Sequence, residues 1–166
     1  MDALVFRNAT PEDASSVVEL IRAMVTDMAS FGGYPPATDH AAWETLRSGI
    51  AEELSEADVA YLLAVVANGE VAGIGGARLV TLGGAFAPKK TLHINALFVR
   101  QHLRRQGIGD ALMSRLLTWG TEAGAVECDL NVLLNNPAQA LYSRHGFSGF
   151  EMKMVRPLTA NDAQPT

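Results

Sequence analysis

Cysteine is nearly absent from the sequence. Cys128 is the only one among 166 residues, which excludes an intramolecular disulfide and a thiolate metal cluster and favours a reducing compartment such as the cytoplasm. Basic residues are also few, since 13 lysines and arginines stand against 18 acidic residues, a formal net charge of −5. Nucleic-acid-binding proteins usually carry a basic face. The balance argues against a nucleic-acid partner and restricts any anion site to a local turn.

Long apolar runs are lacking as well. No uninterrupted apolar stretch has the length that crosses a membrane, and the first residues carry Asp2 and Arg7 without the apolar core of a signal peptide. We therefore expect a soluble, unprocessed chain with no membrane partner. His40, His102 and His145 are scattered without metal-ligand spacing, so we predict no metal site.

The composition that is present indicates one globular domain. The chain is 48% hydrophobic and 19% charged, which is sufficient for a sizeable core and leaves little room for a second domain. We expect this domain to span residues 1–158. Residues 159–166 are small and polar, and we expect them to form a flexible tail.

Apolar periodicity and turn residues predict alternating strands and helices. Asn135, followed by Pro137, is the expected cap of a last helix that ends near His145. The order of elements predicts a mixed α/β fold in which helices pack against a sheet. The expected strands cover residues 4–10, 60–66, 70–82, 91–99, 126–132 (buried) and 147–155, and the expected helices cover residues 11–28, about 39–58, 110–122 and 135–145.

One turn carries the clearest chemical signal. The segment VRQHLRRQGIGDALMSRLL, residues 99–117, places two adjacent arginines and two glycines directly before an amphipathic helix. The first amides of a helix have no partner within it, and its dipole adds about half a positive charge at that end. Arginines add donors suited to phosphate oxygens, and glycines let a phosphate approach the amides. The turn therefore predicts a pyrophosphate site, with a solvated basic turn as the alternative.

Two common phosphate motifs do not match this turn. A P-loop requires lysine and then serine or threonine after its last glycine, where this chain has Asp110 and Ala111. A dinucleotide fingerprint requires a third glycine, where this chain has Leu112.

Two motifs together resemble the GNAT superfamily of acyl-CoA N-acyltransferases. Arg104–Gly109 fits the family's Q/R-x-x-G-x-G/A loop, and NNPAQALYSRHGF, residues 135–147, fits its N-x-x-A-x-x-L-Y-x-x-x-G-F pattern. The resemblance is motif-specific from about residue 91 to 150, whereas residues 29–60 carry little of it. It implies the GNAT fold, an α/β (α+β) architecture with a mixed, mostly antiparallel central sheet and helices on both faces.

The resemblance implies acetyl-CoA (coenzyme A) as the cofactor. The backbone of Leu97–Val99 is expected to pair with the pantetheine arm as an added strand would, and the turn at residues 104–109 is expected to hold the pyrophosphate. Asn135 is expected near the thioester, with a helix cap as the alternative role. The implied cofactor-binding residues are Leu97, Phe98, Val99, Arg104, Arg105, Gln106, Gly107, Ile108, Gly109, Asp110, Ala111, Asn135 and Tyr142.

Three residues are the catalytic candidates. Tyr142 is the implied general acid that protonates the departing thiolate, with simple core packing as the alternative. Many relatives have a glutamate base where this chain has Asn95, which cannot act as a base. Period-two alternation places His93, Asn95 and Leu97 on one strand face, so His93 is the candidate base, directly or through a water held by Asn95. A structural histidine is the alternative, and Cys128 is expected to be a buried apolar residue rather than a nucleophile.

The expected function is transfer of an acetyl group from acetyl-CoA to a primary amine of a small molecule or peptide, by direct attack in a ternary complex. The alternative is a non-catalytic acyl-CoA-binding sensor or regulatory module, which the missing glutamate keeps open. The acidic run Glu52–Asp58 is either a solvated helix face or a surface for a positively charged acceptor. Family habit suggests a homodimer through the last strand or through residues 29–60.

Overall fold

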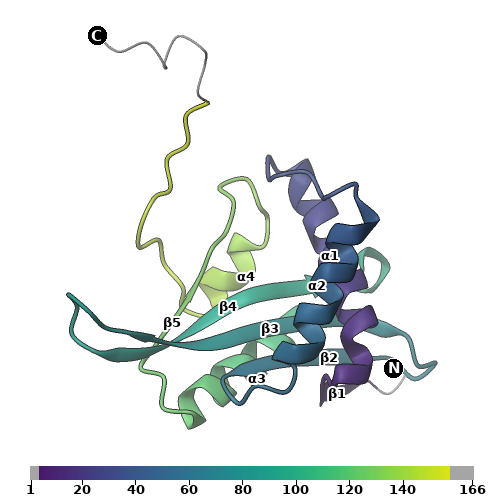
Figure 1. The fold of residues 1–166 in the computed structure, drawn as a ribbon, viewed down its shortest axis with the longest axis horizontal. Coiled ribbons are helices and arrows are strands. Elements are labelled where there is room, and N and C mark those ends of the chain that lie inside the picture. Colours follow the sequence, from purple (N-terminus) through teal and green to yellow (C-terminus); the bar gives the residue numbers. More distant parts are fainter. Residues whose placement is uncertain (1–3, 158–166) are drawn as a thin grey trace.

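A five-stranded sheet forms the centre of the molecule (Figure 1). The computed structural model describes residues 4–157. The strands follow one another across the sheet in chain order, and all neighbours are antiparallel except β4 and β5, which are parallel. The expected domain end at residue 158 and the expected tail at residues 159–166 lie outside the described residues. The strands are β1 (Val5–Asn8), β2 (Val59–Val65), β3 (Val71–Leu82), β4 (Lys89–Val99) and β5 (Glu127–Leu130).

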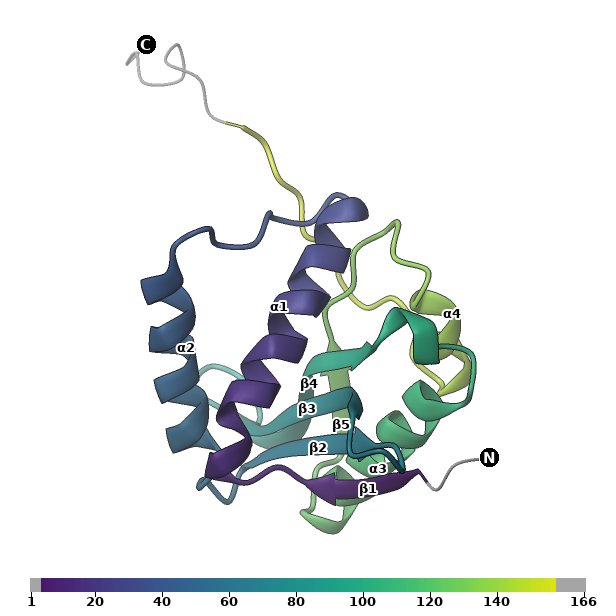
Figure 2. The same ribbon diagram turned by 90° about the vertical axis from the view of Figure 1, so that its right-hand side faces the viewer.

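Helices cover both faces of the sheet (Figure 2). One face carries α1 (Ala14–Ser30), which follows a 3₁₀ turn at Pro11–Asp13, and α2 (His40–Glu53). The other face carries α3 (Ile108–Glu122) and the short α4 (Gln139–Arg144). The expected mixed, mostly antiparallel sheet with helices on both faces is therefore confirmed.

Each face of the sheet has its own apolar core. Leu20 of α1 packs with Leu63 and Ile74 of the sheet, and all three are fully buried. On the opposite face Leu92 and Leu116 are fully buried between the sheet and α3. Burying such side chains contributes about 1.5–3 kcal/mol each, so the two cores fix α1 and α3 against opposite sides of β4.

β5 differs from the buried strand that was predicted. It lies at the edge of the sheet, and in the described part of the chain β4 is its sole strand partner. Glu127 and Asp129 are exposed, whereas Cys128 and Leu130 are half-buried on the α3 side. This alternation is typical of a strand with one covered and one open face.

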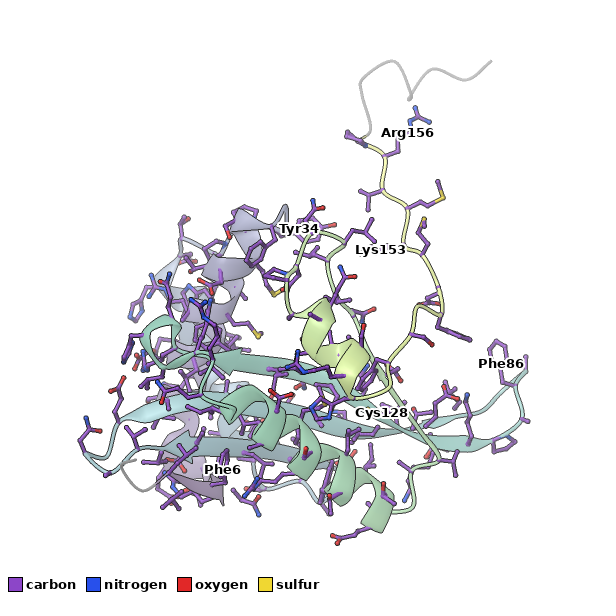
Figure 3. All side chains as sticks on the ribbon, turned by 180° about the vertical axis from the view of Figure 1, so that it is seen from behind. Phe6, Tyr34, Phe86, Cys128, Lys153 and Arg156 are labelled. Atoms are coloured by element: carbon purple, nitrogen blue, oxygen red, sulfur yellow. The ribbon has the colours of Figure 1, made fainter. Side chains whose placement is uncertain are left out.

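The predicted last strand, residues 147–155, is wrong in this structure. Residues after Phe147 leave the body as an extended segment without a strand partner in the described chain (Figures 1 and 3). Phe150 is 94% exposed and Met154 86%, while Lys153 lies 5.9 Å from the centre of the Tyr34 ring. The alternating apolar and charged residues do indicate an extended backbone, but alternation does not specify which edge accepts it.

Candidate active site

The parallel pair β4–β5 opens into a fork. The two strands pair from Thr91 with Glu127 to Ile94 with Leu130, and β4 then continues to Val99 along β3 alone. Alternate backbone groups of an antiparallel strand point away from its partner. Residues 95–99 therefore present free-edge amides and carbonyls at the fork, and this stretch includes the predicted pantetheine segment Leu97–Val99.

A β-bulge lies at the mouth of the fork. Gly76 pairs with Ala96 and the next residue of β3 pairs with Ile94, so Asn95 is the extra residue on β4. A bulge reverses the alternation that follows it. Ile94 and Leu97 accordingly pack into the same core on the α3 side, whereas Asn95 faces the α1 side. The prediction that His93, Asn95 and Leu97 share one face is wrong for Leu97 and agrees with the structure for the other two.

Asn95 lies against a buried tyrosine. Its Nδ2 donates to the Tyr61 hydroxyl at 3.5 Å, and only glycine fits opposite the pair, because a Cβ at Gly76 would lie 2.5 Å from Asn95 Oδ1 and 2.7 Å from Tyr61 Cε1. Burial and the charge of Glu53 raise the pKa of Tyr61. The tyrosine therefore stays protonated at neutral pH and holds the bulge by packing and hydrogen bonding.

His93 has a carboxylate partner on the adjoining strand. Its Nδ1 lies 2.5 Å from Oδ1 of Asp129, and the two residues are register partners. On the other side His93 is the register partner of Arg78. Because Arg78 is surrounded by carboxylates from residues 53, 56 and 58, at 3.3, 2.8 and 3.6 Å, the acidic run after α2 is engaged with this arginine as well as with solvent.

The turn before α3 has the geometry of an anion site. Gly107 is the N-cap residue in the left-handed region at φ +79°, and the first helical hydrogen bond runs from Ala111 N–H to Gly107 O at 3.0 Å. The preceding amides, of residues 107–110, therefore face the turn. Ile108 is buried, so only its backbone reaches this surface, and Gln106 is exposed beside it.

The two arginines of this turn differ in their surroundings. Arg104 donates from Nε to the Val99 carbonyl at 2.9 Å, forms an ion pair with Asp27 and stacks on Phe98 with its guanidinium carbon 5.4 Å from the ring centre. Arg105 is exposed and holds a left-handed φ of +61°. Arg104 thus links the turn to the end of β4, while the charge of Arg105 lies at the surface of the turn.

Helix α4 brings Tyr142 beside α3. The Tyr142 ring packs edge-on to Phe147 with centroids 6.1 Å apart, and burial raises the pKa of its hydroxyl. Asp110 at the start of α3 accepts from Arg144 at 3.0 Å and lies 3.2 Å from His145 Nε2. Burial opposes ionisation of Asp110, but hydrogen bonding and charge from these partners dominate and lower its pKa.

Asn135 does not cap α4 as predicted. It is exposed in the loop after β5, while the side chain of Asn136 accepts from the Ala138 N–H at 2.9 Å and the helix begins at Gln139. Adjacent asparagines have the same capping chemistry, and the loop geometry decides which one faces the helix. Asn135 is therefore left open to the surface beside α4.

Other candidates fall outside this region. Burial raises the pKa of Cys128 to about 12, aided by the charge of Asp129, so the thiol is a poor nucleophile. No group of three or more possible ligands for a metal ion occurs within residues 4–157. None of the helices in the same part of the chain combines the length and apolar composition that a bilayer-spanning helix requires.

Tyr61 and Asp129 were not predicted from the sequence as site residues. Tyr61 is the one polar side chain buried in an otherwise aliphatic strand, and a buried tyrosine usually has a hydroxyl partner. Asp129 is one of two carboxylates in the four-residue strand β5, and carboxylates are uncommon in strands. Both residues stand out in the sequence, but their contacts with Asn95 and His93 on β4 depend on strand pairing, which the sequence does not specify.

The comparisons with known proteins agree with this geometry. The family model described as "Acetyltransferase (GNAT) family" matches residues 22–147, and no curated protein matches the chain. The fold is similar to a GCN5-related N-acetyltransferase from Ralstonia eutropha JMP134, at 23% identity, TM-score 0.74 and coverage of 94% of this chain and 99% of that one.

Two further solved structures share the fold. A predicted acetyltransferase with acetyl-CoA from Clostridium acetobutylicum is 17% identical, with a TM-score of 0.74 over 93% of this chain and 96% of that one. Glucosamine-6-phosphate N-acetyltransferase from Arabidopsis thaliana is 16% identical, with a TM-score of 0.72 over 95% of this chain and 100% of that one. Because the family model spans most of the chain, the protein belongs to the acetyltransferase (GNAT) family of acyltransferases.

Proposed function

We propose that the protein transfers an acetyl group from acetyl-CoA to a primary amine of a small molecule or peptide, by direct attack in a ternary complex. The observation that carries this proposal is the position of the fork beside the open amides of α3. Arg104 joins the two, since it contacts Val99 at the end of β4 and belongs to the turn before α3. An extended ligand with a diphosphate at one end matches both parts of this surface.

The cofactor contacts follow from this arrangement. The amides of residues 107–110 and the side chains of Arg105 and Gln106 bind the pyrophosphate, and the free-edge backbone of residues 97–99 pairs with the pantetheine arm. The N–H of Ala111 is already used within α3, so Ala111 contributes a small side chain that leaves the turn accessible. Asn135 contacts the thioester end from the loop before α4.

The chemistry requires an acid and a base. Attack by the amine nitrogen on the thioester carbon builds an oxyanion, which a backbone N–H of residues 97–99 stabilises. The carbon–sulfur bond then breaks, and Tyr142 gives its proton to the thiolate. Burial raises the pKa of Tyr142, which keeps this acid protonated at neutral pH before the transfer.

His93 is the proposed base. An alkylamine with a pKa near ~10 is mostly protonated at neutral pH, so it must lose a proton to react. His93 and Asn95 lie on the α1 side of β4, and His93 accepts this proton directly or through a water held by Asn95. The His93→Ala variant should lose most of its amine-dependent thiol release at neutral pH, and an unchanged pH–rate profile would remove His93 from the mechanism.

Two measurements test the overall function. Isothermal calorimetry with CoA should give saturable heat, and a thiol-release assay with acetyl-CoA should respond to a panel of primary amines. CoA binding without amine-dependent thiol release would instead support the non-catalytic sensor or regulatory module, which the asparagine at position 95 favours. No heat with CoA would contradict both functions.

We also propose that residues 1–158 form one domain and that the protein acts in the cytoplasm as a homodimer. Exposed apolar residues at 150, 152 and 154 and the open edge of β5 support the dimer, because an extended segment of one copy can pair with that edge in the other. Light scattering should give twice the mass of one chain, and Met152→Ser with Met154→Ser should reduce it to the mass of one. A monomeric wild-type protein would contradict this.

A further inference from the structure

Asp129 of β5 and His93 of β4 form a cross-strand pair next to the fork. The pairing of the two strands ends one residue later, at Ile94 and Leu130. The Nδ1 of His93 lies 2.5 Å from Oδ1 of Asp129. The His93 side chain is 32% exposed and half-buried, whereas the Asp129 side chain is exposed, at 51%. The pair therefore lies on a rigid part of the sheet at the point where the proposed reaction takes place.

Asp129 has no competing cation in the described part of the chain. Arg78, the other register neighbour of His93, directs its guanidinium to the carboxylates of residues 53, 56 and 58. Tyr61, on the same face, shares a hydrogen bond with Asn95. The charged groups around the imidazole are thus Arg78 with its three carboxylates on one side and Asp129 on the other, and only Asp129 contacts the ring.

This contact fixes the form of the imidazole. An ionised carboxylate only accepts hydrogen bonds, so the nitrogen that faces it carries the proton. A neutral His93 with its proton on Nδ1 has its lone pair on Nε2, and that nitrogen is the one able to receive a proton from the substrate. The carboxylate also stabilises the imidazolium that forms when the proton arrives.

We propose that Asp129 is a positioning residue, which holds His93 in the tautomer and orientation that a base for the amine acceptor requires. This inference rests on the proposed function. In the reaction the ammonium form of the acceptor first gives one proton to His93 Nε2, which passes it to solvent. The neutral amine nitrogen then forms a bond to the acetyl carbon and gives a second proton to His93 Nε2, while the carbon–sulfur bond breaks and sulfur takes one proton from Tyr142. Both residues return to their starting forms by exchange with solvent.

The test compares two carboxylates of the same strand. Asp129→Asn replaces the carboxylate with an amide whose N–H can donate to His93 Nδ1. This favours the tautomer with the proton on Nε2, so Nε2 no longer has the lone pair that would accept the proton of the substrate. Glu127→Gln is the matched control, because Glu127 makes an equivalent contact across the pair, to Lys89 at 2.7 Å, and is equally exposed. Asp129→Glu keeps an acceptor and should recover part of the activity.

We expect Asp129→Asn to lower kcat about 10- to 100-fold, because the variant loses part of the rate enhancement that a positioned base supplies. The KM for acetyl-CoA should change little. Nitrogen-15 NMR of the imidazole, assigned with His93→Gln, should show the proton on Nδ1 in the wild type and on Nε2 in Asp129→Asn. Glu127→Gln should leave both readouts unchanged.

Two outcomes would overturn the inference alone. Wild-type activity and an unchanged tautomer in Asp129→Asn would show that His93 does not depend on the carboxylate. Equal losses in Asp129→Asn and Glu127→Gln would show that the carboxylates only hold the strands together. A wild-type protein that binds acetyl-CoA but releases no thiol with any amine would instead overturn the proposed function, and the NMR readout would then still report on the contact.

Discussion

Replacing Gly76 by alanine tests the close packing beneath the bulge. The added Cβ would lie 2.5 Å from Asn95 Oδ1 and 2.7 Å from Tyr61 Cε1, with a second ring atom at 3.0 Å. The asparagine tip is exposed and can move, but Tyr61 is 5% exposed and its ring cannot move without disturbing the core around it. The strain therefore falls mainly on the tyrosine.

The expected cost follows from two opposing terms. Overpacking lowers the free energy of unfolding by about 1–3 kcal/mol. Replacing a strand glycine by alanine raises it by roughly 0.4–1 kcal/mol, because alanine has fewer conformations in the unfolded chain. With the middle of each range the net loss is about 1.3 kcal/mol, which lowers Tm by about 3–5 °C for a chain of this size. Because Asn95 is displaced as well, amine-dependent thiol release should also fall.

Gly49→Ala is the control for this experiment. Gly49 lies inside α2, and a Cβ added there would have no atom within 4 Å, so alanine should stabilise the helix by about 0.5–1 kcal/mol. Differential scanning calorimetry of both variants should give shifts of opposite sign. A Gly76→Ala protein with a Tm at or above that of the wild type would refute the packing argument.

Three further predictions concern single side chains. Tyr142→Phe keeps the ring contact with Phe147 and should lower kcat about 10²- to 10⁴-fold without weakening CoA binding by calorimetry; an unchanged kcat would exclude the acid. Asp13 is paired with Arg7 at 2.6 Å, and the hydrogen bond from Arg7 is the main reason that the pKa of Asp13 is held well below its usual range. The ion pair therefore stabilises the folded protein fully at pH values above the pKa that Asp13 has in the unfolded chain. This stabilisation is lost as the pH falls through the lower pKa of Asp13 in the folded protein. Thermal unfolding should therefore separate Asp13→Asn from the wild type at pH 7 and bring the two together in strong acid, whereas a constant gap would contradict the linkage. Cys128, whose pKa is raised to about 12 by burial, should react slowly with a disulfide reagent until the protein is unfolded, and Cys128→Ala should stay active; loss of activity would point to a covalent route.

Local signals in the sequence located most of the fold. The hairpin of β2 and β3, the strand β4 and helix α3 all have continuous patterns within one element, and each was predicted close to its observed bounds. The turn at residues 104–109 was found for the same reason, since its glycines and arginines are neighbours in the chain. Residue 107 has a positive φ, which favours glycine, so the glycine in the sequence indicates this turn.

The errors arose where a feature depends on another part of the chain. The extra residue at Asn95 is defined only by the register with β3, and it moved Leu97 to the opposite face. The choice between Asn135 and Asn136 as a cap depends on the path of the loop after β5. The extended segment after Phe147 depends on which strand edge is free, and Asp129 became a candidate only through its contact with His93.

The connection between β4 and β5 also has a consequence for synthesis of the protein. Strands β1 to β4 pair with their neighbours in the chain, so they can assemble as the polypeptide emerges. The parallel pairing of β5 requires the whole of α3 to cross over first. A nascent chain therefore folds an antiparallel half that already carries the proposed coenzyme A contacts of residues 97–110, while Tyr142 on α4 is still to be made. Ribosome-bound intermediates that end before residue 127 should accordingly be structured and retain the nucleotide, yet release no thiol.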